Sequence, residues 1–184
     1  MGASAVRKLS VEEFLAWSVD QERRFELHDG EPVAMSPERL SHVEAKGSVY
    51  LALTSAIQRS GVSCRAMTDG ATVRIDARTA YEPDALVYCG RRLPSDAVEV
   101  PNPVIVVEVL SPGTAALDHG AKLRGYFSLS GVAHYLILDA EARVLIHHRP
   151  GKGGAFETRI YADGSLRLDP PGLDLEVAAM FAAD

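Results

Sequence analysis

Two acidic residues stand inside strongly apolar segments of this sequence. Asp84 follows Pro83 and opens the run ALVY at 85–88, and Glu108 lies within VIVVEVL at 104–110. A carboxylate in such a segment costs free energy unless it is ion-paired or bound to a cation. Either residue alone is most simply a structural ion pair. Two such segments in succession instead indicate carboxylates that converge on a divalent cation, and oxygen ligands suit Mg²⁺ or Mn²⁺.

A downstream helix could bring a positive charge to these carboxylates. Asp118, Lys122 and Tyr126 are spaced four residues apart, so they share one face of a helix predicted at 117–129. The simpler interpretation of this spacing is an ordinary Asp118–Lys122 salt bridge, worth a few tenths of a kcal/mol.

The N-terminal part of the chain carries signals for two helix starts and one hairpin. The pattern SVEE at 10–13 is a capping box that predicts a short helix. The strands of the hairpin are predicted at 24–28 and 31–35, joined by an Asp29-Gly30 turn. A second capping box, SHVE at 41–44, predicts a longer helix to about residue 59, ended by Gly61.

Strands dominate the rest of the chain. The β-branched character of 104–110 indicates a strand buried on both faces. The other predicted elements are strands at 62–67, 71–75, 84–89, 134–138 and 144–148, a hairpin of 156–161 with 165–168, and a closing helix at 175–181. This order predicts an α/β or α+β fold with a mixed central β-sheet flanked by helices. No repeat or linker-like tract interrupts it, so we expect a single domain over 1–184.

Composition excludes several classes of protein. With 184 residues, 47% apolar and 24% charged, the chain is typical of a globular domain. Its longest apolar run is too short to cross a bilayer, so no membrane association is expected. Cys64 and Cys89 are expected to be free thiols, and residues 1–10 show no secretory signal, which favours the cytoplasm. The net charge of −6 means that any nucleic-acid role depends on a local site.

Other catalytic motifs are missing or badly placed. The sequence contains neither a G-x-S-x-G nucleophile elbow nor a P-loop. His147 and His148 are neighbours on a predicted strand, so they should face opposite sides and not chelate one metal. Arg91 and Arg92 follow the Asp84 strand and could steer a polyanion, although a solvated loop is the simpler interpretation.

The pattern of Pro83-Asp84, then Glu108, then a downstream lysine resembles the PD-(D/E)-x-K nuclease superfamily. More closely, the sequence resembles the Uma family of restriction-endonuclease-like proteins, from about residue 9 to residue 149. The most specific segments are VEVLSPGT at 107–114 and DHGAKLRGY at 118–126. The lysine of E-x-K would stand two residues after Glu108, where this sequence has Leu110. The resemblance therefore points to Lys122 as the replacement.

The resemblance implies a restriction-endonuclease-like fold and Mg²⁺-dependent hydrolysis of phosphodiester bonds in DNA, with Mn²⁺ as a substitute. Asp84, Glu108 and Glu26 would hold the metal, and Lys122 would complete the catalytic set. His42 and Tyr126 would contact the substrate. The partner would be nucleic acid, and a homodimer is expected because small nucleases often cut duplexes in pairs.

Two other functions fit the same residues. The first is a binding module without catalysis, which the acidic net charge favours. The second is a structural protein in which Arg65 or Arg74 neutralises Asp84 and Glu108. In these cases Glu26 would be an exposed hairpin charge and His42 a surface helix residue. A nuclease instead requires the acids and Lys122 to converge, with the ammonium about 3–5 Å from the Glu108 carboxylate, where charge coupling is substantial.

Overall fold

The computed structural model describes residues 7–110 and 119–181. Helices and strands follow one another in an α+β order. The elements of the first half are α1 (Val11–Ser18), β1 (Phe25–His28), β2 (Glu31–Ala34), α2 (Leu40–Ser60), β3 (Cys64–Thr68), β4 (Val73–Arg74), β5 (Ala80–Tyr81), β6 (Ala85–Cys89) and β7 (Pro103–Val109). Those of the second half are α3 (His119–Ser128), β8 (His134–Asp139), β9 (Val144–Pro150), the 3₁₀ helix η1 (Lys152–Gly154), β10 (Phe156–Tyr161), β11 (Ser165–Leu168), β12 (Leu173–Glu176) and the 3₁₀ helix η2 (Val177–Met180).

A six-stranded mixed sheet forms the centre of the fold, in the order β10-β9-β8-β7-β6-β3. Its neighbours are antiparallel except for β7 and β8, which are parallel. Parallel neighbours need a crossover connection, and α3 is the helix between them. The apolar strand around Glu108 is β7, with a partner on each side and burial along nearly its whole length. The predicted mixed sheet and its buried central strand are therefore confirmed.

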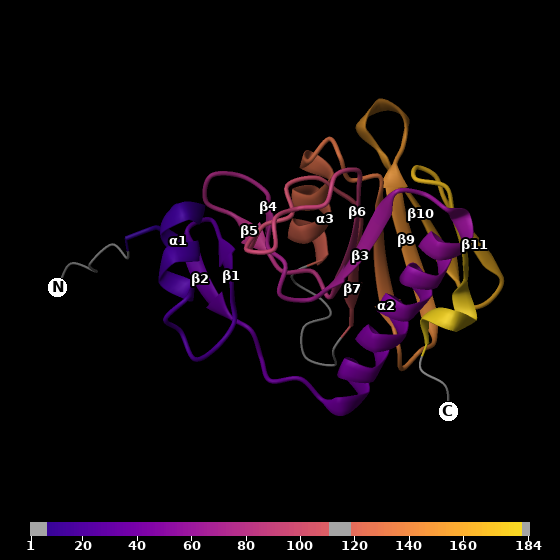
Figure 1. The fold of residues 1–184 in the computed structure, drawn as a ribbon, viewed down its shortest axis with the longest axis horizontal. Helices are drawn as coiled ribbons and strands as arrows, with labels where there is room; N and C mark the ends of the chain where they lie inside the picture. Colours follow the sequence, from indigo (N-terminus) through magenta and orange to yellow (C-terminus); the bar gives the residue numbers. More distant parts are fainter. Residues whose placement is uncertain (1–6, 111–118, 182–184) are drawn as a thin grey trace.

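Helices cover the two faces of this sheet (Figure 1). α2 packs on one face through small and aliphatic residues such as Ala45, Val49 and Leu53. α3 packs on the other face, where Tyr126 is fully buried against Tyr135 and the apolar side chains of β6 and β7. Consequently each face of β6 and β7 has a helix above it, and each helix can bring side chains to the acidic residues of those strands.

The N-terminal hairpin forms a second, smaller sheet beside the first, in the order β2-β1-β5-β4 (Figure 1). The predicted turn is confirmed, because Asp29 and Gly30 both have positive φ, at 46° and 83°. Gly30 also passes close to the chain: a Cβ there would lie 2.6 Å from the Cβ of Lys8. The capping box of Ser10 and Glu13 at the start of α1 is likewise confirmed. The hairpin holds Glu26 on β1, opposite Val33 of β2.

Three predictions about local structure are wrong. α2 begins at Leu40 with Arg39 as its N-cap, and no side chain caps it, so the predicted capping box at 41–44 does not form. Near the C-terminus, 156–161 and 165–168 do not pair with each other: β10 pairs with β9 and β11 pairs with β12. The predicted closing helix is replaced by β12 followed by the single turn of η2.

The expectation of two free thiols is also wrong. Cys64 and Cys89 face each other across the antiparallel β3–β6 pair and form a disulfide. They are 25 residues apart in the sequence, so only the strand register reveals the pairing. The disulfide removes the argument from free thiols to a reducing compartment. Separately, the described part of the chain contains no helix that is both long and apolar enough to span a membrane.

His147 and His148 point to opposite sides of β9, as predicted. His147 is buried against His134, with 2.9 Å between His147 Nε2 and His134 Nδ1, while His148 contacts Thr158. The Nε2 atom of His134 lies 2.9 Å from the carbonyl oxygen of Pro170, which can only accept. His134 Nε2 must therefore donate, so its Nδ1 accepts from His147.

This buried pair predicts a loss of stability in acid. Burial lowers the pKa of His147 to about 4, below the usual 6.5. The folded protein therefore binds this proton less readily than the unfolded chain, and its contribution to stability is lost as pH falls from about 6.5 to 4. We expect His147→Gln, which keeps an amide donor, to lose less free energy of unfolding across this range, by about 1–3 kcal/mol. Urea unfolding at pH 7.5 and pH 5 measures this difference, and parallel losses in both proteins would contradict it.

Candidate active site

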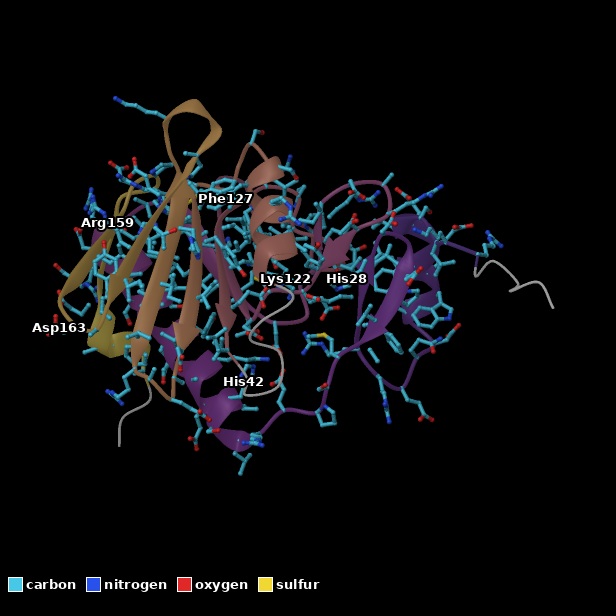
Figure 2. All side chains as sticks on the ribbon, turned by 180° about the vertical axis from the view of Figure 1, so that it is seen from behind. His28, His42, Lys122, Phe127, Arg159 and Asp163 are labelled. Atoms are coloured by element: carbon cyan, nitrogen blue, oxygen red, sulfur yellow. A yellow bond between two sulfur atoms is a disulfide. The ribbon has the colours of Figure 1, made fainter. Side chains whose placement is uncertain are left out.

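Lys122 lies between two carboxylates that come from different sheets. Its ammonium donates to Glu26 Oε1 at 2.9 Å and to Glu108 Oε1 at 3.1 Å. The ammonium is also 5.5 Å from the centre of the Tyr81 ring. The expected separation of Lys122 and Glu108 is therefore confirmed. Figure 2 shows Lys122 of α3 and His28 of β1 next to each other where the two sheets meet.

Each of the two carboxylates has a further donor. Tyr126, one helical turn after Lys122, donates its hydroxyl to Glu108 Oε1 at 2.7 Å. Glu26 Oε1 accepts from the backbone N–H of Glu82 at 2.9 Å, and Glu26 Oε2 lies 3.1 Å from His28 Nε2. The predicted shared face of Lys122 and Tyr126 thus points at one carboxylate. Asp118, the proposed partner in an ordinary helix salt bridge, lies outside the described residues.

Asp84 comes to Glu108 through strand pairing. Ala85 pairs with Val107 in the antiparallel β6–β7 register, so the preceding residue, Asp84, stands opposite Glu108. Asp84 Oδ2 accepts from the backbone N–H of Val109 at 2.6 Å. These contacts fix the carboxylate at the end of the strand pair, with its other oxygen directed at α2.

A second lysine, which the sequence interpretation missed, holds that other oxygen. Lys46 Nζ lies 3.2 Å from Asp84 Oδ1 and donates to Glu38 and Asp69, each at 2.6 Å. His42 Nε2, one turn earlier on α2, faces Asp84 Oδ1 at 3.7 Å. The signal was present in the sequence: Lys46 interrupts the apolar face of a helix four residues after His42.

The ionisation of the three acids differs because their surroundings differ. Burial, together with the neighbouring Asp84 and Glu26 charges, raises the pKa of Glu108 to about 7, although Lys122 and the Tyr126 hydrogen bond act in the opposite direction. Burial also opposes ionisation of Asp84, but His42, the Val109 N–H and Lys46 outweigh it and lower its pKa. His28 and Lys122 do the same for Glu26. Of the three acids, Glu108 is thus the one whose charged form is least favoured, and an additional positive charge would stabilise that form.

The hydroxyl beside Glu108 keeps its proton. Burial and the neighbouring Glu108 and Glu26 charges raise the pKa of Tyr126 well above its usual value. Asp84 also raises the pKa of His42, but for a histidine a raised pKa favours the charged form. The site therefore has a fixed neutral donor on α3 and a titratable donor on α2.

The assembled cluster carries more negative than positive charge, which fits a divalent cation. Its acids outnumber its lysines and arginine six to three: Glu26, Glu38, Asp69, Glu82, Asp84 and Glu108 against Arg24, Lys46 and Lys122. Among the described residues, one trio of ligand atoms lies within 4.8 Å of one another, from Glu38, His42 and Asp84. Asp84 belongs to this trio and also stands opposite Glu108 in the strand pair. A cation bound by the trio, or one bound between Asp84 and Glu108, would therefore depend on Asp84.

The cations beside Asp84 and Glu108 are not the arginines, Arg65 or Arg74, that the structural-protein alternative requires. Arg74 pairs with Glu99 at 2.9 Å and with Glu12. Arg65 stands opposite Tyr88 in the β3–β6 pair. Within 7–110 and 119–181, the side-chain cations at Asp84 and Glu108 are Lys46, His42 and Lys122. The expectation that Arg65 or Arg74 neutralises Asp84 and Glu108 is therefore wrong.

The raised pKa of Glu108 predicts how the metal-free protein responds to pH. A carboxyl with a folded pKa of about 7 and an unfolded value of 4.5 contributes stability below pH 4.5, which is lost as pH rises through 7. The difference corresponds to about 3 kcal/mol. We expect Glu108→Gln to remove this loss. The free energy of unfolding of the variant should therefore rise relative to that of the wild type between pH 4.5 and 7.5. Guanidinium unfolding in EDTA measures the gain, and identical pH profiles would contradict it.

Comparison with known proteins agrees with this architecture. Residues 11–180 match the Uma2 family, described as "Putative restriction endonuclease". A Synechocystis sp. protein described as uncharacterized is 29% identical over 176 residues, covering 95% of this chain and 92% of that protein. The crystal structure of an Anabaena variabilis protein, described as a putative nuclease belonging to DUF820, matches with a TM-score of 0.75 at 17% identity. That match covers 94% of this chain and 97% of the other.

The mixed sheet between two helices places the chain in the restriction-endonuclease-like fold class. Within that class, the chain belongs to the Uma2 family, whose match spans nearly all of the residues described here. The resemblance seen in the sequence is thereby confirmed.

Proposed function

We propose that this protein is a metal-dependent endonuclease that hydrolyses phosphodiester bonds of DNA. The observation that carries the proposal is the convergence of Lys122 with Glu26 and Glu108, while Asp84 stands opposite Glu108 on the adjacent strand. Membership of a family described as "Putative restriction endonuclease" supports the reaction class. A location in the cytoplasm and a homodimer, which would place two sites on a duplex, belong to the same proposal.

We propose that Asp84 and Glu108 hold Mg²⁺, with Glu26 supporting them directly or through water. A bound Mg²⁺ polarises a phosphoryl oxygen and lowers the pKa of a coordinated water. The buried Glu108 is poised for this role, because a cation favours its charged form, which burial disfavours. Mn²⁺ would serve in place of Mg²⁺, because both accept oxygen ligands.

In this mechanism Lys122 orients the attacking water and stabilises the negative charge that develops on the phosphate. Its contacts with Glu26 and Glu108 hold the ammonium at a fixed position before substrate arrives. Tyr126, which the sequence resemblance placed in contact with the substrate, is fully buried and instead fixes the Glu108 oxygen that also accepts from Lys122. His42, charged more readily beside Asp84, is placed to contact a phosphate oxygen of the substrate.

Cleavage assays test this proposal. The purified protein is incubated with supercoiled plasmid and with single-stranded circular DNA in Mg²⁺, Mn²⁺ or EDTA, beside an Asp84→Ala protein prepared identically. We expect nicking or fragmentation with either metal, and none in EDTA or with the variant. Equal cleavage by wild type and variant would indicate a contaminant. Metal binding without cleavage of any substrate would favour the binding module, with which the acidic net charge is compatible.

A further inference from the structure

A groove of about 660 Å³ follows the free edge of the central sheet. β3 is the outermost strand of this sheet, beside β6 (Figure 1). The groove is lined by β3, by α2 and by the loop at 92–100. One end of the groove lies at Thr68 and Asp69, and the other lies at Cys64. The five residues of β3 give the groove a length of roughly 16 Å along this strand.

The groove begins at the candidate active site. Thr68 pairs with Ala85, the residue after Asp84. Asp69, which lines the groove, accepts from Lys46 at 2.6 Å, and Lys46 lies 3.2 Å from Asp84. A chain of two contacts therefore joins the groove lining to the acid proposed to bind metal. A polymer held at the site by one phosphate would extend from it into this groove.

The acids and the arginines of the groove differ in their partners. Glu99 pairs with Arg74, and Asp69 pairs with Lys46 and Arg24, so both acids are held in ion pairs with cations outside the groove lining. The arginines of the groove, Arg65 and Arg92, are exposed and pair with no carboxylate in the described ranges. Two uncompensated guanidinium groups on a protein of net charge −6 make this a local anion-binding surface.

We infer that this groove binds a single-stranded segment of nucleic acid that adjoins the phosphate to be cleaved. The inference rests on the proposed nuclease function and specifies the form of its substrate. Arg65 and Arg92 would contact successive phosphates, and the half-buried Tyr50 on α2 offers a ring beside them. Basic grooves with aromatic walls bind single strands by tracking the backbone and stacking on bases. The groove volume is that of a small-ligand pocket, which suits a few nucleotides of one strand rather than a duplex.

Binding without cleavage tests the inference. Fluorescence anisotropy in EDTA is measured with labelled 12-nucleotide single-stranded DNA, the matching RNA, and a duplex of the same sequence. We expect Arg65→Gln/Arg92→Gln to weaken single-strand binding at least tenfold and to reduce the salt slope by about 1.4, the value for two lost phosphate contacts. Arg159→Gln/Arg167→Gln, which removes two charges from β10 and β11, is the matched control and should change binding less than twofold. Figure 2 shows Arg159 far from Lys122.

The outcomes separate this inference from the proposed function. Equal losses in the two double variants, or tighter binding of duplex than of single strand, would overturn the groove assignment even if the protein cleaves DNA. A change of sedimentation coefficient in Arg65→Gln/Arg92→Gln with unaltered oligonucleotide binding would make the groove a protein interface and also overturn it. Selective loss of single-strand binding in a protein that cleaves nothing would retain the groove and reject the nuclease.

Discussion

Asp84→Asn is expected to lower DNA cleavage by about 10³-fold and to remove the stabilisation of the protein by Mg²⁺. A metal contributes several kcal/mol to the transition state of phosphoryl transfer, and each 1.4 kcal/mol is tenfold in rate. Asparagine keeps an oxygen that can accept from the Val109 N–H, so the strand ends should stay in place. Lys46 retains Glu38 and Asp69 as partners, which limits the structural cost.

Two measurements check this expectation. Cleavage rates are compared at saturating metal, and melting temperatures are followed as Mg²⁺ or Mn²⁺ is added. Metal at 100 times its Kd stabilises the native state by about 2.7 kcal/mol, so a shift should be visible in the wild type and missing in Asp84→Asn. Asp69→Asn is the matched control, because it also removes one carboxylate from Lys46 and leaves Asp84 intact. An unchanged metal shift in Asp84→Asn would remove Asp84 from the metal site.

The sequence predicted the residues around Glu108 better than it predicted the pairing of the C-terminal strands. A carboxylate in a strand that is otherwise β-branched is a rare combination, so Glu108 and Asp84 stood out before their register was known. Helical spacing likewise predicted that Lys122 and Tyr126 share a face, and both contact Glu108. These predictions succeeded because strand alternation and helical period are properties of the local sequence.

The errors arose where tertiary contacts decide the outcome. β9 extends to Pro150 and pairs with β8 on one side and with β10 on the other. β10 therefore pairs with β9 and not with β11. β11 and β12 instead bury Leu166 and Leu175 over the end of the core beneath α2. The role of Lys46 was missed because its three carboxylate partners come from separate segments of the chain, at Glu38, Asp69 and Asp84. Local pattern carries no information on such partners.

Lys122→Met is expected to cut turnover by roughly 10²-fold or more, the usual scale for losing a positioned electrostatic group. The structure adds a second effect. Lys122 is buried and paired with both Glu26 and Glu108, so its removal leaves two acids without their shared cation. Breaking such a buried pair costs about 3–5 kcal/mol. We therefore expect the metal-free variant to melt well below the wild type and to recover part of the difference when Mg²⁺ is added.

Lys46→Met separates the catalytic effect from this loss of stability. Lys46 is equally buried and also paired with several acids, so its removal should destabilise the protein to a similar degree. It touches Asp84 but not Glu108, and we expect its turnover to fall less than tenfold at a temperature where all three proteins are folded. Lys122→Arg should restore stability more than turnover, because a planar guanidinium does not replace a compact ammonium. If Lys46→Met lost 10²-fold while Lys122→Met stayed active, the lysine of the catalytic set would come from α2 and not from the crossover helix α3.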